Sequence, residues 1–298
     1  MNTLFSVIIP HHNIPELLQR CLDSIPDVPE VQVIVVDDNS SPDKVDFGKF
    51  PGLDRQYTQC IFDKEGGGAG HARNIGLSHA DGRWLVFADA DDFFTADAFA
   101  ILNRHKDDLY NVILFKASSV NSEDLSPSDR HLTLNEAIDA ALSGSWPIKK
   151  AIIHRPVPWC KMIRREHVRK HNILFDETKA SNDVMFVIKV TCWAKDDAVA
   201  VAPDVIYTVT TRANSLMDNW KKDPDNFLSR LEVQIRYNKF AKNYPFLRVE
   251  PIIMHLYNST HLGAKTFFRA LALVLRKKAL FSAFGEFMKS VNKHTLKL

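Results

Sequence analysis

Short runs of apolar residues alternate with stretches of helical spacing along the first 115 residues. Runs of β-branched residues bounded by polar ones are typical of strands buried in a parallel sheet, whereas apolar positions three and four apart are typical of helices. The pattern predicts strands over Phe5–Pro10, Val31–Val36, Cys60–Phe62, Trp84–Ala88 and Val112–Lys116, with helices over Pro15–Ile25 and His71–Ala80. Because strands and helices alternate with short connections, we expect an α/β fold built on a mostly parallel, doubly wound sheet.

The remainder of the chain has a less regular pattern. Residues 118–130 are rich in Ser, Asp, Asn and Pro, which predicts a surface loop. Helical spacing follows over Leu134–Leu142 and Asn182–Ala194, and a pair of strands is expected over Ala198–Val201 and Val205–Thr210. Beyond residue 225 the pattern is helical, so we expect a helical C-terminal extension.

Composition narrows the class of protein. The 298 residues, of which 45% are hydrophobic and 25% charged, form a globular chain and exclude a disordered or collagen-like one. The net charge of +2 gives no reason to expect nucleic-acid binding. The four cysteines are scattered without a CxxC pair, and neither a signal peptide nor an 18-residue apolar span is recognisable. We therefore expect a cytoplasmic protein.

Charge is distributed unevenly. Residues 261–298 hold eight Lys or Arg and one Glu, whereas the other 260 residues hold 30 basic and 35 acidic residues. Over 265–291 the basic residues mingle with Phe, Leu, Met and Val, a pattern typical of a helix lying on an anionic membrane surface. The alternative is a helix packed on the catalytic domain with its lysines in water. Peripheral contact at the inner face of the plasma membrane is thus one of two interpretations.

Carboxylates follow two of the predicted strands directly. Asp37-Asp38 end the second strand, and Asp89, Asp91 and Asp92 follow the strand that begins at Trp84. In an open α/β sheet ligands bind at the carboxyl ends of the strands. Five carboxylates there would repel one another, and a divalent cation such as Mg²⁺ or Mn²⁺ would offset that repulsion. The alternative is that Asp91 or Asp92 only caps a helix beginning near Thr95.

A glycine run over 66–70 precedes the helix that carries Arg73. A glycine-rich loop leading into a helix N-terminus favours an anion, and Arg73 adds positive charge. A dinucleotide-binding fingerprint is a weaker interpretation, because that loop follows the first strand directly and here two strands precede it. A flexible turn with a surface arginine is the remaining alternative.

Four segments together resemble the inverting glycosyltransferases of family 2, which have the Rossmann-like GT-A fold. They are SVIIPHHN (6–13), VIVVDDNSS (33–41), GGGAGHARNIGLSHADGRWLVFADADDFF (66–94) and WCKMIRREHVRKHNILFDETKASNDVMF (159–186). The resemblance implies a GT-A nucleotide-sugar domain over 1–216, with a donor half over about 1–116 and an acceptor half over about 117–216. Residues 217–298 would form the helical, basic region.

The resemblance also assigns donor-binding residues. Pro10, His12 and Asn13 match the family segment beside the donor base, and Asp38 matches the acid that accepts hydrogen bonds from the base. Arg73 matches the arginine that contacts the nucleotide. Lone histidines are usually structural, which is the alternative for His12.

Asp89-Ala90-Asp91 matches the DxD motif of the family. This implies that Asp89 holds the ribose or donor sugar, and that Asp91 ligates Mn²⁺ or Mg²⁺, with Asp89 as a secondary ligand. A metal there would stabilise the departing nucleotide diphosphate. Arg212 lies in the YTVTTRANS segment, which matches a family flank that closes the donor site. The resemblance implies that Arg212 reaches the diphosphate and assists its departure.

On the acceptor side, Asp183 matches the catalytic base, which takes the proton of the acceptor hydroxyl. Most relatives have Glu before this Asp and the present chain has Asn182, which leaves the acceptor preference open. A helix N-cap is the alternative for Asn182-Asp183. Trp159 and Lys161 match a segment that lines the acceptor side, although a core tryptophan explains Trp159 nearly as well.

The resemblance implies transfer of a sugar from a nucleotide diphosphate donor, expected to be a UDP-sugar, to a hydroxyl of a glycan or lipid-linked acceptor in surface polysaccharide synthesis. Two alternatives remain. A nucleotidyltransferase also uses a glycine-rich loop and metal-binding acids, but its loop should follow the first strand. A catalytically silent nucleotide-sugar-binding protein is allowed because Asn182 is unusual. The sequence does not predict the oligomeric state.

Overall fold

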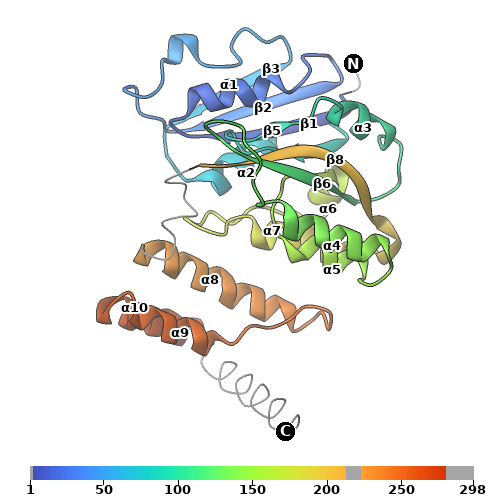
Figure 1. Ribbon diagram of the computed structural model, residues 1–298. Helices are drawn as coiled ribbons and strands as arrows, with labels where there is room; N and C mark the ends of the chain where they lie inside the picture. The colour runs from blue at the N-terminus through green and yellow to red at the C-terminus, as the bar shows by residue number, and fades with distance from the viewer. Residues whose placement is uncertain (1–2, 213–222, 280–298) are drawn as a thin grey trace. The chain divides into compact units, whose positions relative to one another are not determined.

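The computed structural model describes residues 3–212 and 223–279 (Figure 1). The chain divides into two compact units, one formed by 1–177 with 182–212 and the other by 178–181 with 213–298. The expected division into a GT-A nucleotide-sugar domain over 1–216 and a helical, basic region over 217–298 stays a prediction. Residues 213–222 lie where the predicted GT-A domain meets the predicted helical region, and residues 280–298 include the end of the predicted membrane-contact segment. Both stretches lie outside the described residues.

The first unit is built on an eight-stranded sheet in the order β3-β2-β1-β4-β7-β6-β8-β5. β1 pairs in parallel with β2 and β4, β2 with β3, and β6 with β8, whereas β7 is antiparallel to β4 and β6, and β5 to β8. The strands are β1 (Phe5–His11), β2 (Val31–Asp38), β3 (Thr58–Asp63), β4 (Trp84–Phe87), β5 (Phe93–Phe94), β6 (Val112–Asn121), β7 (Lys161–Arg164) and β8 (Val199–Thr211).

Helices of the first unit pack on this sheet. α2 lies against β1 and β2, α4 against β6 and β8, and α3 against β8. The helices are α1 (Pro15–Asp23), α2 (Ala69–His79), α3 (Ala98–Arg104), α4 (Leu132–Leu142), α5 (Ile148–His154), α6 (Arg165–Lys170) and α7 (Val184–Trp193), with 3-10 turns at Phe47–Lys49 and Asp196–Ala198. The mostly parallel α/β fold predicted from the sequence is confirmed.

The predicted pair of strands after residue 198 is wrong, because β8 is one continuous strand. Its pairing with β6 shifts register between Leu114 and Lys116, opposite the stretch that contains Pro203. Proline cannot donate to a strand ladder and is tolerated at such an irregularity. The sequence analysis also missed β5 and β7, which are two and four residues long and too short to show a strand pattern.

The position of α2 on the sheet is fixed by a glycine. A Cβ atom on Gly76 would lie 2.4 Å from Cγ2 of Ile8, which is fully buried in β1. Only glycine therefore lets the helix axis approach the strand this closely. This packing fixes the residues that α2 carries relative to the carboxyl end of β1.

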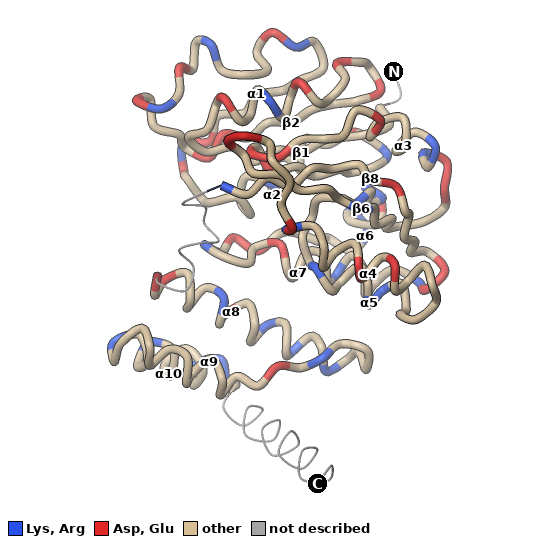
Figure 2. The backbone as a smooth tube through the Cα atoms, viewed as in Figure 1, with Lys and Arg blue, Asp and Glu red and all other residues tan. Residues whose placement is uncertain are grey.

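The second unit has its own apolar core, formed by α8 (Pro224–Ala241), α9 (Ile252–Thr260) and α10 (Ala264–Arg276). Ala270 and Val274 of α10 are fully buried within this unit, while Phe268 and Leu275 remain 64% and 52% exposed. Lys and Arg positions mark α8 and α10, whereas α9 carries neither residue type (Figure 2). Within the described ranges, no helix combines the length and the apolar character needed to span a bilayer. Membrane contact through 265–291 stays a prediction.

Candidate active site

The carboxyl ends of β1, β2 and β4 lie at one edge of the sheet, because these strands run parallel and adjacent. β1 ends beside β2 with His11 opposite Asp37. The turn that carries Asp89 follows β4 at the same edge. The fold therefore places the two acidic segments at the same edge of the sheet, with β1 between the strands that they follow.

A buried histidine joins the ends of β1 and β2. His11 donates from Nδ1 to Oδ1 of Asp37 at 2.7 Å, and its Nε2 accepts the backbone N–H of Ile14 at 3.2 Å. Burial alone would raise the pKa of Asp37, but hydrogen bonds from His11 and Ser40 outweigh burial and hold that pKa below its usual range. The sequence analysis did not single out His11, and only its position directly before a predicted site residue could have drawn attention to it.

The predicted base-binding residues form one hydrogen-bonded corner. His12 donates from Nδ1 to the backbone carbonyl of Asp38 at 2.8 Å, and Oδ1 of Asn13 accepts the backbone N–H of Ser41 at 2.7 Å. The carboxylate of Asp38 accepts the backbone N–H of Gly68 at 3.0 Å. Pro10 and Asn13 are partly buried and His12 is exposed. His12, Asn13 and Asp38 lie together, and Asp38 also anchors the glycine run. Binding of the donor base by these residues and Pro10 stays a prediction.

Arg73 connects the two halves of the site. Its Nη2 donates to Oδ1 of Asp89 at 2.6 Å, and its Nη1 donates to Oδ1 of Asn182 at 2.9 Å. The guanidinium lies 5.4 Å from the centre of the Phe175 ring, and Arg73 is only 6% exposed. A buried guanidinium held by two acceptors on different segments is rigid and always charged. The side chain is therefore positioned between the predicted metal motif and the predicted catalytic base.

The helix that carries Arg73 also holds the segment before the predicted base. A Cβ atom on Gly70 would lie 2.1 Å from the carbonyl oxygen of Asp176. Asn74 accepts the backbone N–H of Phe175 at 2.9 Å and donates to the carbonyl of Phe175 at 3.1 Å. Glu177 lies 3.2 Å from Nδ1 of His71. Two motifs about a hundred residues apart thus pack directly on each other.

β8 fixes the turn that carries the DxD motif. The backbone N–H of Asp89 donates to the hydroxyl of Tyr207 at 2.8 Å. The backbone N–H of Thr210 donates to the carboxylate of Asp92 at 2.7 Å, and Thr210 Oγ1 donates to the carbonyl of Asp91 at 2.8 Å. Asp92 is buried and acts in this turn as a structural acceptor. Tyr207 and Thr210, which belong to the YTVTTRANS segment matched to the family, are positioning residues for this turn. The resemblance did not assign them that role.

Asp91 faces Arg212 at the end of β8. Nε of Arg212 lies 3.2 Å from Oδ2 of Asp91, whose side chain is 23% exposed. Burial, and then the negative charge of Asp89, raise the pKa of Asp91, while Arg212 opposes the shift. Arg20, also missed from the sequence, donates to the backbone carbonyl of Asp91 at 2.7 Å. The Asp91 carboxylate is therefore a desolvated anion that added positive charge would stabilise.

Asp183 lies one residue beyond the Asn182 that Arg73 binds, directly before α7. Its side chain makes no N-cap hydrogen bond to that helix, so capping does not account for it. Burial raises the pKa of Asp183, and the charges of Arg73 and Lys161 oppose the shift. A carboxylate of raised pKa suits a proton acceptor.

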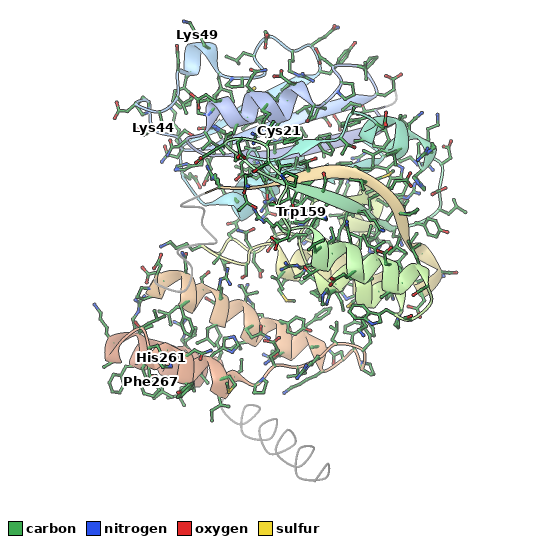
Figure 3. All side chains as sticks on the ribbon, viewed as in Figure 1. Cys21, Lys44, Lys49, Trp159, His261 and Phe267 are labelled. Atoms are coloured by element: carbon green, nitrogen blue, oxygen red, sulfur yellow. The ribbon has the colours of Figure 1, made fainter. Side chains whose placement is uncertain are left out.

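The two residues expected on the acceptor side are buried. Trp159 stacks on Tyr207 with ring centroids 5.7 Å apart, and its side chain lies inside the first unit (Figure 3). Lys161 is fully buried and donates from Nζ to the carbonyl of Val157 at 2.6 Å. Burial lowers the pKa of Lys161 to about 8. The indole supports Tyr207, as the core alternative for Trp159 requires, and acceptor contact by either residue stays a prediction.

The donor set for a divalent cation is partial. Searching only the described part of the chain finds no group of three or more His, Cys, Asp or Glu side chains arranged to hold a metal ion. Asp89 and Asp91 nevertheless offer partly exposed carboxylate oxygens, the ligands that Mg²⁺ and Mn²⁺ prefer, and phosphate oxygens commonly complete such a shell. The residues present therefore fit a cation that a nucleotide diphosphate shares.

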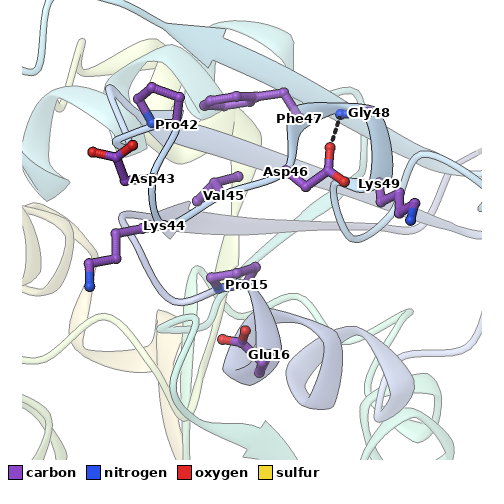
Figure 4. Close-up of a pocket in the computed structure, with 10 residues that line it drawn as sticks. All are labelled: Pro15, Glu16, Pro42, Asp43, Lys44, Val45, Asp46, Phe47, Gly48 and Lys49. Atoms are coloured by element: carbon purple, nitrogen blue, oxygen red, sulfur yellow. Dashed lines mark hydrogen bonds between the residues drawn. The ribbon is translucent and has the colours of Figure 1, made fainter.

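A hollow of about 800 Å³ opens beside the start of α1 (Figure 4). Its wall is the loop over 42–49 together with Pro15 and Glu16, and Asp46 accepts the backbone N–H of Gly48 across a short turn. None of the predicted site residues lines this hollow.

Solved structures share this fold. A crystal structure of Staphylococcus aureus TarS 1–349 in complex with UDP-GlcNAc aligns with a TM-score of 0.60 and 21% identity, covering 90% of this chain and 72% of the other. The mannosyltransferase PcManGT from Pyrobaculum calidifontis, in complex with GDP-Man and Mn²⁺, aligns with a TM-score of 0.55 and 19% identity, covering 96% and 81%. The fold is therefore the GT-A fold of glycosyltransferases.

Sequence relatives agree. The poly(ribitol-phosphate) β-N-acetylglucosaminyltransferase TarS of S. aureus Mu50 is 28% identical over 233 residues, which are 75% of this chain and 38% of TarS. The uncharacterised glycosyltransferase EpsJ of Bacillus subtilis 168 is 25% identical over 235 residues, 73% of this chain and 64% of EpsJ. The chain thus spans less than two thirds of the length of either relative. The family model described as "Glycosyl transferase family 2" matches residues 6–171, more than half of the chain, and the protein belongs to this family.

Proposed function

We propose that this protein is an inverting glycosyltransferase that moves a sugar from a nucleotide diphosphate donor to a hydroxyl group of a bacterial cell-envelope glycan. The observation that carries the proposal is the bridge formed by Arg73, which holds Asp89 at 2.6 Å and Asn182, the neighbour of Asp183, at 2.9 Å. The guanidinium group of Arg73 thereby links the acids expected at the donor to the segment of the carboxylate expected to act as base. Family membership supports the same reaction class.

The donor half of the reaction follows from the corner at the ends of β1 and β2. His12 and Asn13 lie beside Asp38, and Asp38 anchors the glycine run that leads into α2. Backbone N–H groups at a helix N-terminus favour an anion such as a diphosphate. The UDP-GlcNAc bound in the TarS structure supports a UDP-sugar as the donor.

Positive charge is needed where the nucleotide diphosphate departs, because negative charge develops on its oxygens. Arg73 and Arg212, which contact Asp89 and Asp91, supply part of that charge from the chain itself. A bound Mn²⁺ or Mg²⁺, held by Asp91 with Asp89 as a second ligand, would supply Lewis-acid stabilisation of the leaving group. The Mn²⁺ in the PcManGT complex supports this choice of ion.

Asp183 takes the proton of the attacking hydroxyl. Its raised pKa, caused mainly by burial, strengthens the carboxylate as a base, and the charge of Arg73 opposes the shift by favouring the ionised form. Inversion requires that the hydroxyl attacks from the side opposite to the leaving group. We therefore propose that Asp183, which lies on a segment separate from the DxD turn, stands on that opposite side.

The acceptor class is proposed from the relatives. TarS and a relative in Bacillus spizizenii are named as transferases acting on poly(ribitol-phosphate), and a further relative in B. subtilis is named as a minor teichoic acid biosynthesis protein. We therefore assign the acceptor to the cell-surface glycans or their lipid-linked precursors, with the enzyme acting on the cytoplasmic side of the membrane, where nucleotide sugars are made.

The test compares wild type with Asp183→Asn. Melting temperatures are measured against UDP-, GDP-, dTDP- and CDP-sugars with Mn²⁺, because the true donor raises the melting temperature in line with its affinity. Transfer to a glycan acceptor is then measured with the donor so found. Retained donor binding with lost transfer in Asp183→Asn supports the proposal. Binding without transfer in wild type would instead leave a silent nucleotide-sugar-binding protein.

A further inference from the structure

A basic groove of about 850 Å³ lies at the sheet edge opposite to the candidate active site. It is formed where β1 and β4 begin and antiparallel β7 ends, since Phe5 pairs with Trp84 and Trp84 with Arg164. Five cations line it. Three are on α6, one ends β7 and one directly precedes β4: Arg165, Arg169, Lys170, Arg164 and Arg83.

Most of this positive charge has no carboxylate partner. Arg164 donates to the backbone carbonyls of Tyr110 and Asp108, and Arg165 donates to the carbonyl of Gly82 at 2.7 Å. These bonds fix the guanidinium groups without neutralising them. Carbonyl partners therefore leave both charges available to an anionic ligand.

Only one of the five cations is in an ion pair within the described residues. Arg83 lies 3.0 Å from Asp107, whereas the exposed side chains of Arg169 and Lys170 make no ion pair to any part of the chain that the structure describes. Asp81 and Glu166 also line the groove, so the lining carries an excess of three positive charges. The groove is suited to a ligand with several negative charges.

We propose that this groove binds an acceptor polymer that carries repeated phosphodiester groups, at a distance from the point of transfer. The inference rests on the proposed function, because the bound polymer is the acceptor. Guanidinium groups fixed in a concave surface match phosphate oxygens through paired N–H donors. A polymer with regularly spaced phosphates can contact several of the five cations at once.

The position of the groove favours a polymer over a membrane. The parallel strands run from the groove edge to the active-site edge, and the seven residues of β1 span about 20 Å. A flat lipid surface bound at the groove would therefore face away from Asp183 and the donor site. A flexible chain can reach from one edge to the other, and holding it on the groove raises the local concentration of its hydroxyl groups at the active site.

The experiment uses the full chain and a fluorescently labelled poly(ribitol phosphate) oligomer as probe. Arg169→Gln/Lys170→Gln is compared with Lys49→Gln/Lys195→Gln, which removes the same charge from exposed positions outside the groove. We expect the groove variant to bind the oligomer about tenfold more weakly, with a flatter dependence on salt, and the control to bind like wild type. The KM for the polymer, relative to that for a single ribitol phosphate unit, should rise by a similar factor.

Each remaining outcome has a defined meaning. Equal polymer binding by wild type and both variants overturns the groove assignment, whether or not transfer occurs. Loss of binding to phosphatidylglycerol vesicles in the groove variant, with polymer binding unchanged, also overturns it and assigns a lipid surface instead. If the polymer binds through the groove but no donor supports transfer, the groove stands as a polymer site and the proposed function fails.

Discussion

The buried Arg73 and the partly exposed Asp89 form an ion pair, with Nη2 and Oδ1 2.6 Å apart, that joins α2 to the turn after β4. The other terminal nitrogen of the same guanidinium binds Asn182. A displacement of α2 would therefore move the predicted metal motif and the predicted base together. Because of this coupling, the site depends on the glycine run, the DxD turn and the Asn182-Asp183 pair holding their positions relative to one another.

Arg73→Lys should lower kcat/KM for transfer by about a hundredfold. A lysine ammonium is a point charge on a flexible chain and cannot hold Asp89 and Asn182 at once in fixed geometry. Steady-state kinetics with the identified donor measures the effect. Arg104→Lys, at an exposed pair with Asp204, is the control and should leave kcat/KM unchanged. A loss confined to the melting temperature, with full kcat/KM in the folded fraction, would contradict the bridging role.

Asp183→Asn should lower kcat by about 10²- to 10⁴-fold while donor affinity changes little, because proton acceptance is lost and the shape of the side chain is kept. Isothermal titration with the donor and a transfer assay on the same preparation separate the two effects. Asp43→Asn, at an exposed position beside the hollow near α1, is the matched control. Unchanged transfer in Asp183→Asn would remove this residue from the mechanism.

The pH dependence of kcat/KM should report the same carboxylate. Asp183 acts as a base only when ionised, and burial raises its pKa above the usual aspartate range. Activity should therefore rise with pH through that raised pKa and level off above it. A profile already flat from the ordinary aspartate range upward would show that the base is not desolvated.

Gly70→Ala should disrupt the site through a backbone contact. The added Cβ would lie 2.1 Å from the carbonyl of Asp176 and 2.9 Å from Cβ of Asn182, so the segment before Asp183 has to move. We expect kcat to fall by about a hundredfold. Gly82→Ala, whose Cβ would lie 2.5 Å from the backbone nitrogen of Ser6 at the opposite edge of the sheet, is the control, expected to lower stability with little change in kcat per folded molecule. Equal kinetic effects of the two variants would argue against a specific role for Gly70.

The sequence predicted where the parallel strands lie along the chain and that the acids following them lie at one edge of the sheet. The runs that became β1, β2 and β4 are continuous and apolar because both faces of these strands are buried, and the acids that follow them mark where the strands end. Residues that act through short local segments could be located from such patterns.

Contacts between distant segments could not be predicted in the same way. The Arg73–Asn182 bond and the approach of Gly70 to Asp176 join segments separated by about a hundred residues, and no periodicity encodes them. The support that Tyr207 and Thr210 give to the DxD turn depends on β8 being one strand, whereas the hydrophobic pattern predicted two. The burial of Lys161 could not be predicted from the sequence either, because lysine side chains are rarely fully buried in proteins.

Asp91→Asn should weaken the response of the enzyme to a divalent cation. Removing the negative charge takes away the main carboxylate ligand that we propose, so a higher Mn²⁺ concentration should be needed for half-maximal transfer, by about tenfold or more. The assay titrates Mn²⁺ after treatment with EDTA. Asp97→Asn, an exposed acid before α3, is the control. Full transfer by EDTA-treated wild type would show that Asp91 serves Arg212 and not a metal.

Lys161→Met should change how stability depends on pH. Burial lowers the pKa of Lys161 from 10.5 to about 8, so between these pH values the unfolded chain holds a proton that the folded protein has released. Because of this residue, the free energy of unfolding increases by up to about 3 kcal/mol as pH rises from about 8 to 10.5. Methionine fills a similar volume without a titrating group, so the variant should lack this gain.

Urea unfolding of both proteins at pH 7, 8, 9 and 10 measures the difference between their free energies of unfolding, which cancels the titration of the cysteines that they share. The free energy of unfolding of wild type minus that of Lys161→Met should increase as the pH rises. Lys195→Met, at an exposed position, is the control and should run parallel to wild type across the range. Parallel curves for wild type and Lys161→Met would mean that Lys161 keeps its ordinary pKa, and therefore that the chain around Val157 and Cys160 admits water to the ammonium group.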